Sequence, residues 1–466
     1  MKLSPLTTRE IAPRIPSEVT AVLAALHLSD PDTSLLKALD DREWTSLLEF
    51  CITAHLTLPL AQLAMDGFPD WVVDRLKANL ADNALRFENI KAIYREAAKA
   101  LDDAKVEHLV IKGFTQAPDY VADPRLRRQS DFDFFCPPER IDDARAALEA
   151  IGYKSYDVNE AIADHTSVLV RLGNWQWSGN PFDPEMPLGI DVHFCLWNER
   201  ASLIRIPEVE LFWERRMTRV VDGLSFPCLS PVDHLGYLSL HILRNIFLYE
   251  WIVHHVRELA IFLNSHADDD AFWQSWCDTH TPSLRSFEAI AFYYAQSWFG
   301  CRLHCQAAQE IANLAVTQKS WLQRFSGSTL EVMFRQNKDS VWLHLSFVSS
   351  PSDRVKILTR CLIPPRIASI GAPTVNMRNK RMVASKDSNP LRQYVVYLIS
   401  RSAAHAHASF TTLTRGLRWR LSQHRLLGPN SEMTDVSVHE PHAYAMKVRR
   451  HTKKVEVDKL GARNEL

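Results

Sequence analysis

The sequence predicts an α+β fold in which a small mixed sheet lies within a mainly helical chain. Apolar residues recur at helical spacing over long stretches on both sides of residues 105–222, whereas alternating and β-branched segments fall inside that range. Glycine is scarce, with 14 residues in 466, which disfavours a sandwich or barrel built on many tight turns. We therefore expect a compact α/β module flanked by helices.

Residues 1–104 are expected to form an N-terminal helical region. Its longest helix is expected over 70–104, because apolar side chains there recur every three or four residues and would line one face. That stripe consists of Leu80, Ala84, Phe87, Ile90, Tyr94, Ala97 and Leu101.

Residues 105–222 are expected to form the α/β core. Alternating apolar residues, glycines and prolines at the segment ends, and one amphipathic segment identify its elements. These elements are strand 106–111, strand 131–136, helix 139–150, strand 166–172 and strand 188–196. The segment 173–187 is expected to be a loop, and its residues Trp175 and Trp177 either stack on a base or sugar or cover the core.

Helices are expected again after Pro231. The chain from 231 supplies two helices, 283–316 at least one more, and 353–363 and 390–425 look helical and basic. The region after residue 428 lacks sustained periodicity and is expected to be a loosely ordered tail. The expected domains are 1–104, 105–222, 223–345, a basic helical region 346–428, and the tail 429–466.

Charge is distributed unevenly along the chain. Residues 351–466 carry 21 Lys and Arg against 8 Asp and Glu, although the whole chain has a net charge of −1. This excess, which includes Arg415, Arg418 and Arg420, predicts contact either with an anionic partner or with the acidic body of the same chain. Eight cysteines without a CxxC pair, no apolar leader and no membrane-length apolar run lead us to expect a cytoplasmic protein with reduced thiols.

Three aspartates are the strongest candidates for chemistry. Asp131 and Asp133 lie two apart on an expected strand, so their side chains point to the same face. Asp191 lies in the middle of another expected strand, where an ionised side chain is costly unless it is paired or bound to metal. Carboxylates are ligands that Mg²⁺ prefers, and two such ions neutralise charge in nucleotidyl transfer. Solvent-facing acids on an edge strand are the alternative, which the flanking phenylalanines disfavour.

A Lys-Gly pair ends the first expected strand of the core. Lys112 and Gly113 precede Asp131 by fewer than twenty residues, and a glycine turn lets backbone N–H groups approach phosphate. Together with the aspartates, this pair suggests a site for a metal-bound nucleoside triphosphate.

These motifs resemble the large, poorly characterised nucleotidyltransferase family of the polymerase-beta-like superfamily. The resemblance spans roughly residues 40–265, with a weaker echo at 354–400. It is carried by Val110-Ile111-Lys112-Gly113, then by Arg127 ahead of Asp131-Phe132-Asp133-Phe134, and then by Ile190-Asp191-Val192-His193. Two departures stand out. Better-known relatives have Gly-Ser in place of Lys-Gly, and the acid-Ile-Ala expected after the module reads here Arg257-Glu258-Leu259-Ala260.

The resemblance implies a nucleotidyltransferase that moves a nucleoside monophosphate from an NTP to a hydroxyl acceptor and releases pyrophosphate. Asp131, Asp133 and Asp191 would hold two Mg²⁺ ions, with Mn²⁺ as an alternative, and Asp191 would also act as the base toward the acceptor.

Further roles follow from the same resemblance. Gly113 would let the backbone approach the phosphates, while Lys112 and Arg127 would offset triphosphate charge. His193 would contact the acceptor or orient an acid. A small molecule, a sugar, a protein and, less favoured, RNA all remain open as acceptors.

Two other readings are kept open. His234 and His241 are seven residues apart in an expected helix and could share a metal, although core or groove-lining histidines are the more common case. The chain could also be a non-catalytic scaffold or regulatory protein that keeps the nucleotide fold and binds partners through its helical arms.

Overall fold

The structure is a computed structural model that describes residues 15–155, 164–171, 173–362 and 390–427. The chain divides into a large compact unit, Met1–Gly416, and a small one, Leu417–Leu466. The sequence-predicted tail 429–466 lies outside the described residues. Among the described helices, none combines the length and apolar character needed to cross a membrane.

The N-terminal region is helical up to the long helix α6. Its helices are α2 (Ser17–Ala25), α3 (Ser34–Lys37), α4 (Asp41–Thr53), α5 (Thr57–Leu60) and α6 (Asp70–Asp103). A capping box begins α4, because the Asp40 side chain accepts from the Glu43 amide and Glu43 accepts from the Asp40 amide. The helix expected over 70–104 is confirmed as α6, and most of its predicted stripe is buried.

The predicted small mixed sheet is confirmed, with five strands where four were expected. Its strands lie in the order β1-β2-β5-β4-β3, and the central pair β2–β5 is parallel while the other pairs are antiparallel. Their bounds are β1 (Leu109–Val110), β2 (Asp131–Phe135), β3 (Lys154–Ser155), β4 (Leu169–Val170) and β5 (Gly189–His193). Helix α7 (Ile141–Ala150) connects β2 to β3, and β6 (Met217–Val221) pairs with β7 (Leu224–Cys228) in a separate hairpin.

The strands are shorter than the sequence predicted. Strand 106–111 is reduced to β1, strand 166–172 to β4 in its described part, and strand 188–196 to β5. After β1 the chain turns at Gly113, with φ +74°, into the 3₁₀ helix η1 (Gly113–Gln116). Apolar alternation therefore overestimated the length of backbone pairing, because it continues into residues that pack without a partner strand.

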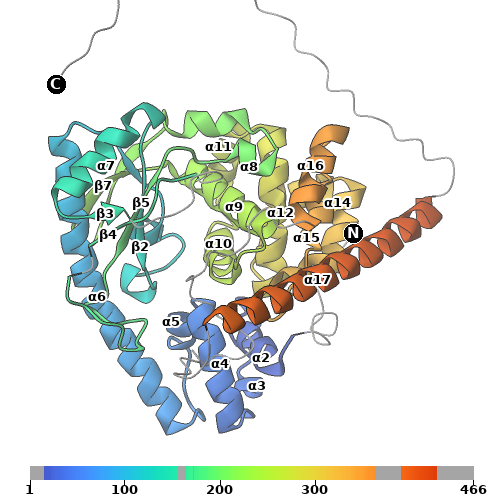
Figure 1. Cartoon of the computed structure of the whole chain (residues 1–466), viewed down its shortest axis with the longest axis horizontal. Helices are drawn as coiled ribbons and strands as arrows, with labels where there is room; N and C mark the ends of the chain where they lie inside the picture. Colours follow the sequence, from blue (N-terminus) through green and yellow to red (C-terminus); the bar gives the residue numbers. More distant parts are fainter. Residues whose placement is uncertain (1–14, 156–163, 172, 363–389, 428–466) are drawn as a thin grey trace, which may run out of the picture. The chain divides into compact units, whose positions relative to one another are not determined.

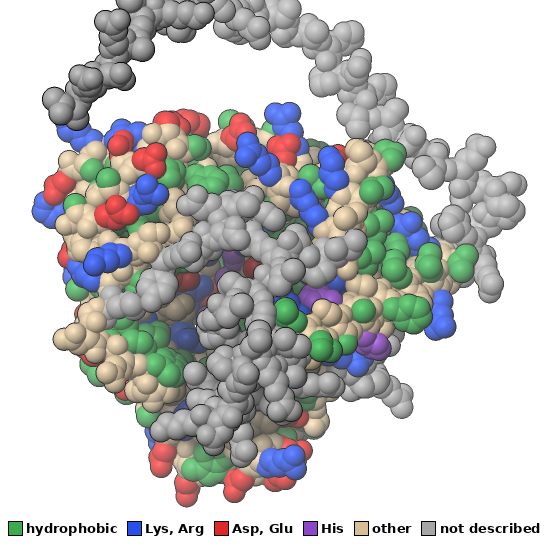
Figure 2. Space-filling view, viewed as in Figure 1, with side chains coloured by type: hydrophobic (Ala, Val, Ile, Leu, Met, Phe, Trp, Pro, Cys, Tyr) green, Lys and Arg blue, Asp and Glu red, His purple; other side chains and the backbone are tan. Residues whose placement is uncertain are grey.

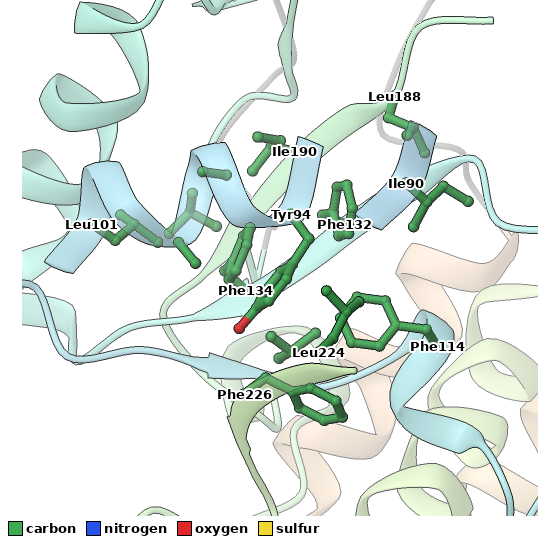
Figure 3. Packing of buried hydrophobic residues seen from close by; sticks show 14 of the residues in the cluster. Ile90, Tyr94, Leu101, Phe114, Phe132, Phe134, Leu188, Ile190, Leu224 and Phe226 are labelled. Carbon is green, nitrogen blue, oxygen red and sulfur yellow. The ribbon is translucent and has the colours of Figure 1, made fainter. Parts of the chain in front are cut away.

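Aromatic side chains join α6 to one face of the sheet (Figure 3). Tyr94 of α6 lies with its ring centroid 5.2 Å from that of Phe114, and 6.3 Å from those of Phe132 and Phe134 in β2. Phe114 in turn meets Phe226 of β7 edge-on at 4.9 Å. This core fixes the apolar face of β2, so the alternate residues of the strand must face the other way.

Helices α8 to α16 make up the rest of the large unit, together with the first part of α17 (Figure 1). Helices α9, α10 and α12 pack side by side, and α9 begins with a Ser230 cap and ends at Tyr249 in the left-handed region. Their bounds are α8 (Glu199–Ser202), α9 (Pro231–Leu248), α10 (Val253–Ser265), α11 (Asp270–Thr279), α12 (Pro282–Phe299), α13 (Cys305–Asn313), α14 (Val316–Glu331), α15 (Ser340–His344), α16 (Pro351–Leu362) and α17 (Pro390–Leu427).

The basic C-terminal region is helical where it is described. Figure 2 shows hydrophobic side chains gathered along α17, and Ile399 and Phe410 are 65% and 68% exposed. Arg415 of α17 forms an ion pair with the fully buried Asp339 at 2.7 Å. At this arginine, the acidic body of the same chain is the partner, which is one of the two alternatives the charge pattern left open.

Candidate active site

Pairing of β2 with β5 brings the three predicted aspartates to one face of the sheet. The two strands are parallel and in a register that sets Asp133 opposite Asp191 and Asp131 opposite Gly189. Phe132, Phe134, Ile190 and Val192 alternate with them and are fully buried in the core. Acids from two parts of the chain, 58 residues apart, therefore meet at the centre of the sheet.

A buried arginine on α6 holds the entrances of both acid-bearing strands. Arg86 has no exposed surface, and its Nε donates to the Gln129 carbonyl just before β2. Its Nη1 donates to the carbonyls of Asp183 and Met186, at 2.9 and 2.7 Å, in the loop that leads to β5. Sequence reasoning placed this residue on α6 without a role, and only a charge inside an apolar stripe marks it.

Lys112 and His193 converge on one oxygen of Asp133. Lys112 Nζ lies 2.5 Å from Asp133 Oδ1, and His193 Nε2 lies 2.9 Å from the same atom. All three side chains are almost completely buried. Of the two roles expected for His193, this geometry favours orienting an acid, because its imidazole nitrogen faces Asp133.

Burial and neighbouring charges separate the three carboxylates electrostatically. Burial alone would raise the pKa of Asp133, but the Lys112 ammonium and the His193 hydrogen bond outweigh it and hold that pKa well below its ordinary value. Burial, with the Asp133 charge nearby, raises the pKa of Asp131 and raises that of Asp191 to about 7. Asp191 Oδ1 is buried and, within the part of the chain that the structure describes, has no hydrogen-bond partner. One acid of the cluster is thus left as an unsatisfied group of near-neutral pKa.

Gly113 is required by a neighbouring side chain. Its φ is +74°, and a Cβ at this position would lie 2.5 Å from Gln129 Nε2. The Gln129 amide occupies that space, accepting from the Phe114 amide and donating to the Asp131 carbonyl. The Lys-Gly turn is therefore tied directly to the start of β2 through Gln129, a residue that sequence reasoning missed.

Arg127 points toward the helical region. Its Nε donates to Glu258 Oε1 of α10 at 2.8 Å, and both side chains are about nine-tenths buried. The positive charge of Arg127 also lowers the pKa of Asp131 and so opposes burial, which raises that pKa. Glu258 lies in the segment that reads Arg-Glu-Leu-Ala where the family pattern has acid-Ile-Ala. Its carboxylate serves here as the ion-pair partner of Arg127.

The decisive comparison concerns the family. A family model described as uncharacterised nucleotidyltransferase matches residues 40–300, which is more than half of the chain. The chain belongs to this family. The matched range contains the Lys-Gly turn, all three aspartates, and α9 and α10. No curated protein matches the sequence.

Among solved structures, the chain is similar to an antigenic nucleotidyltransferase-like protein from Paracoccidioides brasiliensis. The identity is 12%, the TM-score is 0.26, and the match covers 47% of this chain and 96% of that one.

The donor set of this site fits a hard divalent cation. Its acids are three carboxylates, and Asp191 Oδ1 is a buried oxygen to which no described residue donates a hydrogen bond. The side chains are not arranged as a closed ligand set, because Lys112 contacts Asp133. Within the residues that the structure describes, no three His, Cys, Asp or Glu side chains are placed to hold a metal.

The paired-histidine metal hypothesis finds no support in the described residues. His234 packs on Tyr120, with ring centroids 4.8 Å apart. His241 instead meets His255 of α10, with their Nε2 atoms 3.2 Å apart. The two histidines therefore contact different partners.

Helix α9 contributes further groups to the site that were not predicted. The positive charge of Lys112 acts on Tyr237 and His241. Burial is the main cause that holds the pKa of His241 well below its ordinary value, and the Lys112 charge is the next. One turn further, Arg244 forms an ion pair with Asp164 at 3.1 Å. Asp164 precedes His165, whose Nδ1 lies 4.0 Å from Asp191 Oδ1. Only the folded chain reveals that this helix faces the carboxylates.

Trp175 and Trp177 lie in the loop before β5, as expected. Trp175 Nε1 donates to Asp183 at 3.0 Å, in the segment that Arg86 also holds. Trp177 is 57% exposed and meets Trp175 at a ring distance of 6.0 Å. Trp175 therefore braces the loop, and stacking on a base or sugar remains a prediction for Trp177.

Proposed function

We propose that this nucleotidyltransferase moves a nucleoside monophosphate from an NTP to a hydroxyl-bearing acceptor in a Mg²⁺-dependent reaction that releases pyrophosphate. The single observation that carries the proposal is the pairing of Asp133 with Asp191 across β2 and β5, with Asp191 Oδ1 buried and without a hydrogen bond from any described residue. Membership of the family supports nucleotidyl transfer in general. The ion, the acceptor and the leaving group are our inference.

Asp131, Asp133 and Asp191 are the residues that would hold Mg²⁺, and when bound the ions would offset charge on the triphosphate. Lys112 provides a further positive charge on the same face of the sheet. Arg127 is proposed to act from a greater distance, because its guanidinium is shared with Glu258. Gly113 keeps the backbone of the Lys-Gly turn close to the start of β2.

In the transfer step, the acceptor oxygen forms a bond to the α-phosphorus of the NTP. The bond between that phosphorus and the oxygen bridging to the β-phosphate breaks, and its electron pair leaves with pyrophosphate. The acceptor proton passes to Asp191, which acts as the general base. His193 keeps Asp133 oriented throughout.

The test measures pyrophosphate release and transfer of an α-phosphate label with each of the four NTPs, with and without Mg²⁺. The variant Asp131→Asn/Asp133→Asn should lose Mg²⁺-dependent nucleotide binding and label transfer. Asp66→Asn, which changes an exposed aspartate outside the site, is the matched control and should behave as the wild type. Equal nucleotide binding by the double variant and the wild type would refute the role of the aspartates. Binding without any transfer would favour the scaffold alternative.

A further inference from the structure

A cavity opens beside the C-terminal end of α9. Its volume is about 280 Å³, close to the lower end of small-molecule pockets at about 300 Å³. Aromatic and aliphatic side chains from four parts of the chain line most of it, among them Trp197, Phe247, Leu248 and Ile357. A pocket of this kind suits a ligand with an apolar body.

The charges at this cavity are of one sign. Arg244 and Arg360 line it, and the described residues of the lining include no Asp or Glu. Arg244 is already paired with Asp164 and Glu250, at 3.1 and 3.9 Å, so Arg360 is the cation that can meet a ligand. His344, also in the wall, stacks on Phe247 with ring centroids 4.1 Å apart, and burial lowers its pKa to about 4, so it is neutral at pH 7. Arg360 Nη1 donates to the carbonyls of Arg200 and Ala201, and within the described residues this guanidinium has no carboxylate partner. An anionic group on the ligand is therefore favoured over a cationic one.

One face of α9 connects this cavity to the carboxylates. Tyr237 and His241 lie within reach of the Lys112 charge, and Arg244 and Leu248 follow at spacings of three and four residues. At a rise of about 1.5 Å per residue, His241 and Leu248 are about 10 Å apart along the helix. Arg244 connects the cavity to the carboxylates, because it lines the cavity and also forms an ion pair with Asp164. Asp164 precedes His165, whose Nδ1 lies 4.0 Å from Asp191 Oδ1.

We propose that the cavity binds the acceptor, and that the acceptor is a small molecule with an apolar or aromatic body, a hydroxyl group and an anionic group. This assignment rests on the proposed function. The anionic group pairs with Arg360 while the apolar body contacts Phe247 and Leu248. The hydroxyl extends along α9 toward Asp191, where its oxygen bonds to the α-phosphorus, pyrophosphate leaves, and Asp191 takes the proton.

The lining disfavours the other acceptor classes. A sugar needs a wall rich in hydrogen-bonding groups, and RNA needs an open basic groove with exposed aromatic rings. The wall of this cavity is mainly apolar and carries two arginines. A small apolar anion uses both features at once.

The first experiment measures the chemistry of the cavity with two dyes of nearly the same shape. 8-Anilinonaphthalene-1-sulfonate carries an anionic group, and N-phenyl-1-naphthylamine does not. We expect the full-length protein to bind the sulfonate with one site per chain. Arg360→Ala should weaken that binding about tenfold, the loss of one charge-assisted contact, and leave the neutral dye unaffected. Equal effects on both dyes, or none on either, would overturn the anion preference.

Filling the cavity is the second arm. Ala201 lines the wall, so Ala201→Trp should abolish binding of both dyes. Leu85→Trp, on an exposed leucine of α6, and Arg302→Ala, on an exposed arginine that pairs with Asp268, are the matched controls and should bind both dyes normally. Both cavity variants should retain the wild-type circular dichroism spectrum and bind Mg²⁺-ATP normally. If a folded Ala201→Trp protein binds the sulfonate as the wild type does, the site is elsewhere and the proposal is wrong.

The third arm tests whether the cavity adjoins the nucleotide. Trinitrophenyl-ATP with Mg²⁺ should bind together with the sulfonate dye and quench nearly all of its emission by energy transfer. Displacement of the dye, or weak quenching in a ternary complex, would contradict the assignment as acceptor pocket. A wild-type protein that binds no nucleotide analogue would refute the proposed function and the acceptor role, while the two dye arms would still decide whether the cavity takes apolar anions.

Discussion

Two clusters of buried charge in the large unit differ in how completely their polar atoms are satisfied. In the first, Asp233 of α9 accepts from Arg215 at both oxygens and also meets His280 at 3.3 Å, and His280 contacts Glu288 at 3.0 Å through its other nitrogen. Trp276 then donates to the second oxygen of Glu288. Every carboxylate oxygen of this network has a partner, and we call it the closed network.

The aspartate cluster on β2 and β5 also combines carboxylates with a histidine and a cation but is left open. Asp133 receives both Lys112 and His193 on a single oxygen, while buried Asp191 Oδ1 has no hydrogen-bond partner among the described residues and only His165 at 4.0 Å nearby. An unsatisfied buried oxygen costs about 1–3 kcal/mol, so a fold keeps one only where something else is gained. The contrast suggests that the closed network stabilises the fold, whereas the open cluster trades stability for binding.

The largest expected effect is at Asp191. Asp191→Asn removes the base and should lower transfer roughly 10²–10⁴-fold. The same change should stabilise the fold at pH 8. The pKa of Asp191 is about 7 when folded and ordinary when unfolded, so its contribution to stability falls as pH rises from about 4 to 7.

Chemical denaturation at two pH values measures this gain. The variant should exceed the wild type by roughly 2–4 kcal/mol at pH 8 and by much less at pH 4.5. If Asp191→Asn is inactive and also less stable than the wild type at pH 8, the open cluster stabilises the fold as the closed network does, and the distinction between them is wrong.

Asp233→Asn should show the reverse pattern. It breaks a buried ion pair, which costs about 3 kcal/mol of unfolding free energy, and leaves Arg215 and His280 without their carboxylate. Mg²⁺-ATP binding by the folded protein should stay at the wild-type level. Urea unfolding and calorimetric titration test the two halves, with Asp66→Asn as the control. Loss of nucleotide binding without loss of stability would remove the distinction between the clusters.

The closed network should also give the protein a pH-dependent stability on the alkaline side. Burial would lower the pKa of His280, but Glu288 and Asp233 outweigh it and raise that pKa to about 9. A raised histidine pKa stabilises the fold fully below about 6.5, and this contribution is lost as pH rises through 9. The wild type should lose roughly 1–3 kcal/mol of unfolding free energy between pH 6.5 and 9.5. His280→Asn should remove most of this slope, and an unchanged slope would place its origin elsewhere.

A smaller effect is expected at Lys112. Lys112→Met should weaken triphosphate binding about tenfold and weaken binding of Mn²⁺ alone much less, because its proposed role is to offset phosphate charge. Isothermal titration with ATP and with Mn²⁺ separates the two. An equal loss of both would count against that role and would assign Lys112 to holding Asp133 alone.

Much of this fold was predictable from local pattern. The α6 stripe and the helices after Pro231 follow from 3.6-residue periodicity, and the Asp-x-Asp of β2 follows from period-two alternation beside buried phenylalanines. The lengths of the strands were overestimated, because pairing depends on partner strands that are distant in the sequence.

The contacts that complete the site were less accessible. Arg86 binds a backbone carbonyl and Arg244 binds a carboxylate, each more than 40 residues away in the sequence. Gln129 binds a backbone amide of the Lys-Gly turn. No local spacing in the sequence encodes such contacts. In the sequence, Glu258 was identified only as part of a departure from a family motif, and its ion pair with Arg127 is visible only in the fold. Composition likewise cannot tell an open carboxylate cluster from a closed one.

The central claim is that the open cluster is completed by divalent metal and nucleotide. Its most direct test counts bound Mn²⁺ by electron paramagnetic resonance in the presence of a non-hydrolysable ATP analogue. We predict two Mn²⁺ ions per wild-type chain, and none above background for Asp131→Asn/Asp133→Asn at the same concentrations. The same number of ions on both proteins, or none on the wild type, would contradict the account.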